Sequence, residues 1–287
     1  MTNTNEVTTV NPFFNVVREP AFAELNGQKI EINRDVLLNP ETQDVVGVVG
    51  KNYSLVQNID VARFFDEAFS KNRILSTKDH LNTNTGKWIR EIVLDDDEYT
   101  AEIDSGDTVK AKVQIYNGYD GKTAVGFRVS AYRLVCTNGL MGWKEIHGGN
   151  FTHMGGNLVD RIQAQFANNF SNFSKNFGVW EEWTKQGFGQ TRFNQFVELH
   201  TKSTLPENVK PTKEMKLIEY LSDKQAEAIK DLYVPTMELY KEKENKWGAY
   251  NVLTAIGTHH TDARKGSPLF TAGYKRINRL VEDFYDY

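Results

Sequence analysis

Residues 109–136 read VKAKVQIYNGYDGKTAVGFRVSAYRLVC, and this stretch decides the fold. Apolar and polar residues alternate on both sides of its centre, a pattern typical of β-strands with one buried face. The centre, residues 117–121, contains Asn-Gly and Asp-Gly, which adopt positive φ angles at little cost. The stretch therefore predicts a β hairpin of strands 109–117 and 122–136, with a turn slightly longer than the minimum.

The two faces of this hairpin differ in chemistry. One face is apolar and carries Val109, Ala111, Val113, Ile115, Val125, Phe127, Val129 and Ala131. The other combines cations with aromatic rings, namely Lys110, Lys112, Tyr116, Arg128 and Tyr132, and Arg133 and Lys144 follow it. Lysine and arginine neutralise phosphates and aromatic rings stack on bases, so this face suits single-stranded nucleic acid. An ordinary solvated sheet face carries the same residue types, and composition does not distinguish DNA from RNA.

Helical patterns lie on both sides of the hairpin. Residues 59–72 predict one early helix, with Asp60 as its N-cap. After residue 156, phenylalanines at positions 166, 170, 173 and 177 predict a single helical stripe that packs on a sheet. Three further helical segments are expected at 212–233 (broken near Ser222), 245–258 and 270–285.

These elements predict an α+β fold in which a curved antiparallel sheet with one early helix precedes a mostly helical C-terminal half. The expected parts are an N-terminal arm with the first strands (1–40), an antiparallel β-rich core (41–156) and a helical region packed on the sheet (157–287). In the last part, Trp247 is spaced to meet Tyr250 or Asn251 on a helix and to dock that helix onto the sheet.

Composition excludes several classes of protein. The chain has 287 residues, 39% of them hydrophobic and 25% charged, which excludes wholesale disorder. A single cysteine, Cys136, excludes an internal disulfide framework and a Cys-rich zinc site. No run of about 18 apolar residues and no secretory signal are visible, so we expect a cytoplasmic protein. Common catalytic and phosphate-binding motifs are missing, so we expect no enzyme activity, no cofactor and no metal. His147 and His153 are expected on the surface.

Charge is unevenly distributed along the chain. Residues 91–107 carry eight acids and no base, whereas residues 108–144 carry six bases and one acid. The simplest interpretation is two strands with differently solvated edges; another is an acidic patch beside an anion-binding face. The acidic segment leaves two alternatives open: a surface that mimics DNA toward a protein partner, or a metal-dependent nuclease using residues 95–97.

Four short strings resemble one known family. They are VGVVGKNYSLVQN (46–58), NGYDG (117–121), RLVCTN (133–138) and WGAYNVLT (247–254), which are similar to its VVGxxYxxVQN, N-x-x-D-G, R-(V/L)-V-C-x-N and WGxYNAxT patterns. This is the phage/plasmid-like protein family, a domain-of-unknown-function family of phages and plasmids. The resemblance implies a phage or mobile-element origin and the cytoplasm of the host bacterium. It supplies no catalytic residues.

The order of sheet and helices also resembles ring-forming single-strand annealing proteins, an analogy at the level of the fold. We therefore expect a non-enzymatic phage single-stranded DNA-binding or annealing protein of recombination or replication, acting as a homo-oligomer and in contact with host or phage replication proteins. The expected binding residues are Lys110, Lys112, Tyr116, Arg128, Tyr132, Arg133 and Lys144, with Lys51 and Tyr53 as further candidates. The alternative is a phage interaction protein, a host-takeover or anti-defence factor, that acts through an acidic surface.

Overall fold

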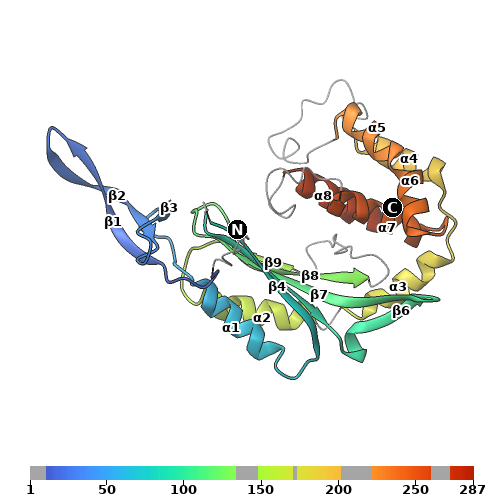
Figure 1. Cartoon of the computed structure of the whole chain (residues 1–287), viewed down its shortest axis with the longest axis horizontal. Helices are drawn as coiled ribbons and strands as arrows, with labels where there is room; N and C mark the ends of the chain where they lie inside the picture. Colours follow the sequence, from blue (N-terminus) through green and yellow to red (C-terminus); the bar gives the residue numbers. More distant parts are fainter. Residues whose placement is uncertain (1–10, 84, 134–147, 171–172, 202–220, 260–271) are drawn as a thin grey trace, which may run out of the picture. The chain divides into compact units, whose positions relative to one another are not determined.

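A computed structural model describes residues 11–83, 85–133, 148–170, 173–201, 221–259 and 272–287 (Figure 1). The fold is mixed α+β, with open antiparallel sheets, one early helix and several helices in the C-terminal half, as the sequence predicts. The chain forms two compact units. The first unit comprises Met1–Leu94, Val113–Arg128 and Gly148–Phe170, and the second comprises Asp95–Lys112, Val129–His147 and Ser171–Tyr287. None of the described helices is long and apolar enough to cross a membrane.

A three-stranded antiparallel sheet opens the first unit. Its strands β1 (Val17–Leu25), β2 (Gln28–Leu38) and β3 (Val45–Val49) lie in that order. The β1–β2 turn is Asn26-Gly27, and both residues have positive φ, as a two-residue hairpin turn requires. One end of this sheet is buried, because Leu37, Val46 and Val49 pack with Tyr119. The other end is a two-stranded ribbon that extends away from that packing (Figure 1).

A six-stranded sheet contains the predicted hairpin. Its strands are β4 (Ile74–Asn82), β5 (Lys87–Leu94), β6 (Thr100–Asp104), β7 (Asp107–Asn117), β8 (Val125–Arg133) and β9 (Gly148–Phe151). They lie in the order β4-β5-β7-β8-β9, and β6 pairs with the first residues of β7, from Asp107 to Lys110. The hairpin prediction is confirmed as β7 and β8, although the connection runs over residues 118–124 and is longer than expected. A short 3-10 helix, η1 (Asp97–Tyr99), precedes β6.

Two helices of the first unit cover one face of this sheet. They are α1 (Asn58–Ala68) and α2 (Leu158–Phe170) (Figure 1). Phe166 of α2 lies 5.1 Å from Phe127 of β8 and 4.9 Å from Phe65 of α1, measured between ring centroids. Edge-to-face aromatic packing therefore joins both helices to the apolar face of the hairpin.

The start of α1 differs from the prediction. The N-cap position is Gln57, not Asp60, and the Gln57 side chain makes no cap bond because it exchanges two hydrogen bonds with the backbone of Val16. Asp60 lies in the first turn, where its charge favours the helix dipole. Ile59, the second residue of α1, is exposed.

The second unit contains the remaining helices. They are α3 (Lys175–Thr184), α4 (Gln190–Leu199), α5 (Asp223–Asp231), α6 (Tyr233–Tyr240), α7 (Lys246–His259) and α8 (Ala272–Asp286). The predicted helices 245–258 and 270–285 are confirmed as α7 and α8. Ser222, where a break is expected, forms a capping box at the start of α5. The aromatic core of this unit includes Trp180 and Trp247, whose ring centroids lie 5.5 Å apart.

The single phenylalanine stripe is wrong. Phe166 and Phe170 belong to α2, whereas Phe173 precedes α3 and Phe177 lies within it. Spacings of 3, 4 and 7 residues are the same for one helix and for two helices joined by a short break, so the pattern could not distinguish them. The part of the expectation that concerns packing on the sheet is confirmed for Phe166.

Candidate nucleic-acid interface

In the first unit, the first two family-like strings lie against each other. Tyr119 Oη accepts a 2.8 Å hydrogen bond from the Asn58 backbone N–H, and Asn117 Nδ2 donates to Asn58 Oδ1 at 2.9 Å. Tyr53 Oη donates to the Gly118 carbonyl at 3.0 Å. These bonds fix the turn after β7 to the segment that leads into α1, and thereby fix the position of Tyr53.

A cavity of about 370 Å³ opens beside Tyr53. We call it the Tyr53–His153 cavity. Its walls come from the segment after β3, the β7–β8 connection and the segment after β9, and they include Asn52, Tyr53, Lys122, Thr123, His153 and Met154. Tyr53 forms an antiparallel bridge with Met154, so two distant parts of the chain hold the walls together. Lys122 and Met154 are exposed at this site.

His153 stacks on Tyr53 at the cavity. The two ring centroids lie 4.5 Å apart with an interplanar angle of 13°. His153 is only 5% exposed, so the expectation of a surface histidine is wrong for this residue; His147 lies outside the described residues. Burial lowers the pKa of His153, which favours the neutral ring. His153 Nδ1 lies 2.9 Å from the Ser54 carbonyl and must donate to it, which leaves Nε2 as the acceptor. Within the described residues, this buried Nε2 has no hydrogen-bond partner.

On the hairpin of β7 and β8, an arginine lies over an aromatic ring. The guanidinium carbon of Arg128, an exposed residue on β8, lies 5.6 Å from the ring centroid of half-buried Tyr116. Tyr116 Oη donates to the carbonyl of Gly149 at 3.1 Å and lies within hydrogen-bond distance of Asn150 Oδ1. Tyr116 therefore crosses β8 from β7 to β9. Gly126 permits this crossing, because a Cβ there would lie 2.6 Å from Tyr116 Oη.

Strand register places this pair and the cavity on one face of the sheet. Gly126 pairs with Asn150 and Arg128 pairs with Gly148, so these residues share a face. Ala124 and Thr152 line the cavity, and each lies two residues, about 7 Å, from Gly126 and Asn150, respectively. The opposite face of β8 is the one on which Phe127 meets Phe166. The exposed cation, the half-buried ring and the cavity thus lie on one face of the sheet in the first unit.

Most of the other predicted cations are not open to solvent. Lys110, Lys112 and Arg133 are buried, so the expectation of an open cationic face is wrong for them. The reason is that β7 is a central strand that is buried along both faces. Lys110 forms an ion pair with Asp95, which compensates its burial. Tyr132 is half-buried, and Lys144 lies outside the described residues, as does Cys136.

Lys51, by contrast, is exposed but paired. Its Nζ lies 2.7 Å from Asp35 and 3.0 Å from Glu31. The hydrogen bond with Asp35 is the main reason why the pKa of Lys51 is raised. Both carboxylates reduce the charge that Lys51 can offer to a phosphate, so Lys122 and Arg128 are the stronger cations of this surface.

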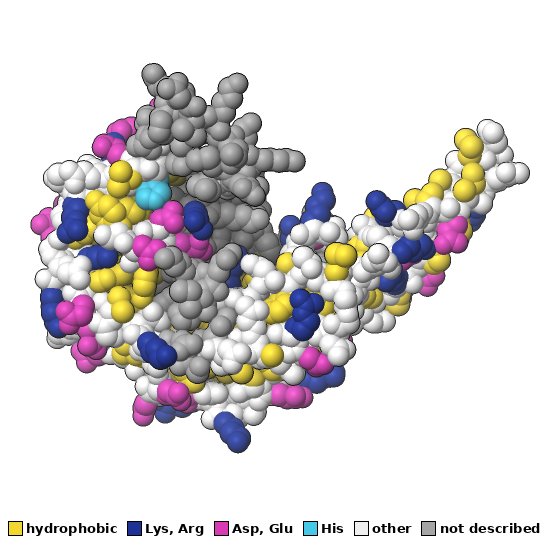
Figure 2. Space-filling model, turned by 180° about the vertical axis from the view of Figure 1, so that it is seen from behind, with side chains coloured by type: hydrophobic (Ala, Val, Ile, Leu, Met, Phe, Trp, Pro, Cys, Tyr) yellow, Lys and Arg dark blue, Asp and Glu magenta, His cyan; other side chains and the backbone are white. Residues whose placement is uncertain are grey.

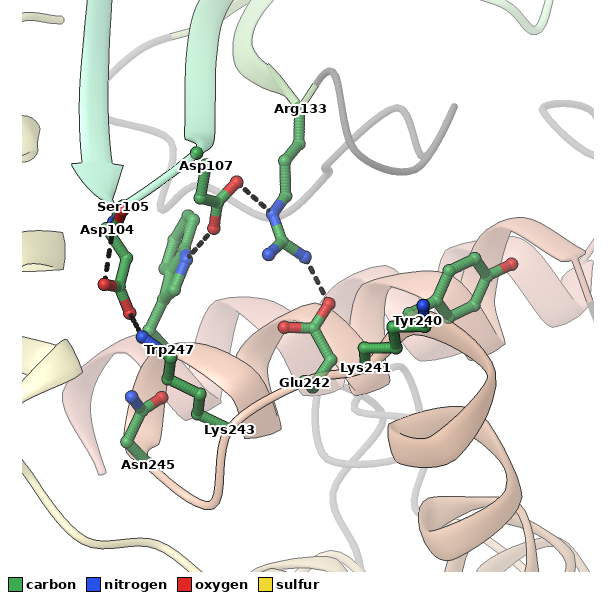
Figure 3. A pocket seen from close by; sticks show the side chains of 11 residues that line it. Asp104, Ser105, Asp107, Arg133, Tyr240, Lys241, Glu242, Lys243, Asn245 and Trp247 are labelled. Carbon is green, nitrogen blue, oxygen red and sulfur yellow. Dashed lines mark hydrogen bonds and ion pairs between the residues drawn. The ribbon is translucent and has the colours of Figure 1, made fainter.

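In the second unit, the last two family-like strings meet at Asp107 (Figure 3). Arg133 Nε donates to Asp107 Oδ1 at 2.5 Å, and Trp247 Nε1 donates to Asp107 Oδ2 at 2.7 Å. Arg133 also forms an ion pair with Glu242, and Lys243 lies 2.7 Å from Asp104. We call Asp107, Arg133, Glu242 and Trp247 the Arg133 cluster. It borders a cavity of about 200 Å³.

The hydrogen bonds and ion pairs of the Arg133 cluster hold the β6–β7 end of the sheet to the start of α7. Its two carboxylates raise the pKa of Arg133 despite burial, and burial raises the pKa of Glu242. The sequence predicts Arg133 as a cation that binds nucleic acid, whereas its guanidinium is buried and paired with Asp107 and Glu242. The expected docking role of Trp247 is confirmed, since it bonds β7 and also stacks on Tyr250 at 5.8 Å.

The acidic segment 91–107 is partly neutralised in the same way. Asp95, Asp104 and Asp107 pair with Lys110, Lys243 and Arg133, respectively. Exposed acids remain at Asp97, Glu98 and Glu102. Over the described ranges, no three His, Cys, Asp or Glu side chains are placed to hold one metal ion. The structure therefore adds no support for a nuclease centre at residues 95–97.

Sequence reasoning did not identify His153, Lys122 or Asn150 as site residues. The available signal was the position of His153 in a glycine-rich segment, between Asn150 and Gly155. A high density of glycine indicates tight turns at the surface, which predicts a solvated histidine there.

Comparisons with known proteins give one match. Comparisons with curated proteins and with solved structures each return none. A family model described as "Domain of unknown function (DUF932)" matches residues 45–281, a range that includes the Tyr53–His153 cavity, the Arg133 cluster and all four family-like strings. The chain therefore belongs to the DUF932 family of domains of unknown function.

Proposed function

We propose that this protein is a non-enzymatic single-stranded DNA-binding protein that anneals strands in phage recombination or replication. The observation that carries the proposal is a cavity lined by an aromatic pair and Lys122, on the sheet face that also carries exposed Arg128 over half-buried Tyr116. A base that enters the cavity meets the edge of the Tyr53–His153 stack and the thioether of Met154. Lys122, which lines the cavity, and Arg128, on the same face of the sheet, neutralise phosphates.

The same residues set the expected strength and salt dependence. Stacking of a base on an aromatic side chain contributes about 1–3 kcal/mol and tolerates any base. Two phosphate contacts on a single strand give a slope of log K against log salt of about −1.4. Binding is thus expected to be modest in each protomer and to gain strength when several protomers act along one strand.

Two further parts of the proposal rest on resemblance. The four family-like strings support a phage or plasmid origin and action in the cytoplasm of the host bacterium. The order of sheet and helices supports action as a homo-oligomer that anneals strands, with replication proteins as its partners.

The test is a titration of a labelled single-stranded oligonucleotide, followed by fluorescence anisotropy at low and moderate salt. The double variant Arg128→Glu/Lys122→Glu is expected to lower affinity at least tenfold. Arg63→Glu is the matched control, because Arg63 is an exposed arginine on α1, which covers the opposite face of the sheet. An RNA oligonucleotide of the same sequence decides between DNA and RNA.

An annealing assay with complementary strands follows if the wild type binds. Equal affinity of the wild type and the double variant would remove this site. Absence of binding even at low salt would remove the proposed function and leave the alternative of an interaction protein with an acidic surface.

A further inference from the structure

One face of the three-stranded sheet is apolar and open to solvent. Ile30, Ile32 and Val36 alternate along β2, and Val36 and Leu38 pair with Val48 and Val45 of β3, respectively. We call Ile30, Ile32, Val36, Val45 and Val48 the apolar face. Four of the five are 39–55% exposed, and Val36 is half-buried. Water therefore reaches a row of β-branched side chains on two neighbouring strands.

The opposite face of the same strands is already used. Leu37 and Val49 pack there with Tyr119, and Asp35 pairs with Arg18 and Lys51. An antiparallel sheet with one face in water normally carries polar residues on that face. Near Leu37 and Val49 the strands are apolar on both faces, a pattern typical of sheets covered on both sides, which indicates that the apolar face is covered in the working protein.

The ribbon that extends from this sheet points to the same conclusion. Between Asp35 and the β1–β2 turn, the described residues of β1 and β2 pair only with each other, and Phe22 and Leu25 are exposed there. Figure 2 shows hydrophobic side chains open to solvent at the end of this arm. An isolated two-stranded hairpin is marginally stable in water. A partner that packs along β2 would stabilise the ribbon as well as cover the valines and isoleucines.

Charge on the apolar face identifies the partner. Within the three strands, this face carries Glu19 and Arg34, which are both exposed. Glu19 pairs with Val36, and Arg34 precedes Val36 by two residues, so both charges lie on this face, beside the β-bulge between Pro20 and Phe22. Opposite charges cancel, which disfavours nucleic acid as the occupant. A twofold axis between them would bring each Glu19 opposite the Arg34 of a second copy, which makes the face self-complementary.

We propose that the apolar face binds the same face of a second copy of this chain. The two sheets would pack about 10 Å apart, with their valines and isoleucines interdigitated and two Glu19–Arg34 pairs at the centre. β2 has 11 residues and is about 36 Å long, so the contact is elongated and narrow. A contact of this size gives a dimer that dissociates on dilution. The proposal is independent of the nucleic-acid site.

Sedimentation velocity over a dilution series, without nucleic acid, tests this contact. The wild type is expected to pass from monomer to dimer as concentration rises. Glu19→Arg alone and Arg34→Glu alone place like charges opposite each other, and each is expected to raise the dissociation constant at least tenfold. An equimolar mixture of these two variants restores both opposite-charge pairs and is expected to dimerise like the wild type.

A control variant tests whether the effect depends on the face that carries the changed charge. Glu24→Arg changes an exposed glutamate of β1 that pairs with Lys29 and lies on the other face of the ribbon, and it is expected to leave the dimer unchanged. Circular dichroism confirms that each variant is folded. A wild type that stays monomeric at every concentration, or a mixture that does not dimerise, would overturn the proposal.

Discussion

Removal of the Asp107 carboxylate is expected to weaken the second unit strongly. In Asp107→Ala, Arg133 loses one of its two carboxylates and Trp247 Nε1 loses its acceptor, both in a buried setting. A hydrogen bond to a charged group contributes about 1.5–3 kcal/mol, and removal of one partner from a buried ion pair costs about 3–5 kcal/mol. Because Arg133 retains Glu242, we expect the free energy of unfolding to fall by about 3–4 kcal/mol.

Urea unfolding gives the change in free energy, and hydrogen exchange of the α7 amides locates it. Asp97→Ala is the matched control, since Asp97 is an exposed acid of the same segment and its loss is expected to cost less than about 0.5 kcal/mol. Trp247→Phe removes the indole donor and keeps a ring. The pair Asp107 and Trp247 should therefore show coupling in a double-mutant cycle. If Asp107→Ala lowers the free energy of unfolding by less than about 1 kcal/mol and leaves hydrogen exchange of α7 unchanged, the Arg133 cluster does not stabilise the second unit as argued above.

Two further predictions concern the first unit. His153 has a pKa below its ordinary value of 6.5 because it is buried, so the unfolded chain binds the proton more tightly. The free energy of unfolding is therefore expected to be highest above pH 6.5 and to fall as the pH drops below that value. Urea unfolding from pH 5 to 8 measures this dependence, and His153→Leu should make it weaker. An equal pH dependence in both proteins would contradict a neutral, buried His153. Gly47→Ala would put a Cβ 1.8 Å from the Tyr119 carbonyl oxygen, and we expect a loss of about 1–3 kcal/mol in thermal unfolding. Gly50→Ala, with nothing within 4 Å of the added Cβ, should unfold like the wild type, and equal effects of the two changes would exclude the close approach.

Local patterns predicted the elements that depend on local physics. The alternation around Asn117–Gly121 gave the β7–β8 hairpin, and helical periodicity gave α7 and α8 to within a few residues. A break in the helical pattern is expected near Ser222, and the structure shows there the capping box that begins α5. The spacing of Trp247 and Tyr250 likewise predicted a contact on one helix.

The candidate site was harder to predict because its contacts join distant residues. Lys110 and Lys112 alternate with apolar neighbours, which indicates a solvated face, yet burial of a central strand depends on what packs over it. Asp107 and Trp247 are 140 positions apart, and no spacing rule connects them. Tyr53, chosen for its place in a family-like string, does lie at the cavity. Its stacking partner His153 lies 100 positions later in the chain, and this contact is visible only in the folded structure.

The alternation of the two units along the chain constrains synthesis and truncation. Each unit is assembled from three separate segments, and strands β7 and β8 run from one unit into the other. On the ribosome, residues 95–112 and 129–147 emerge before any of the helices α3 to α8 with which they form a unit. A fragment that stops at Phe170 holds every segment of the first unit but leaves these strands without their helices. Expression of the two units as separate contiguous fragments would thus divide strands β7 and β8 rather than a linker.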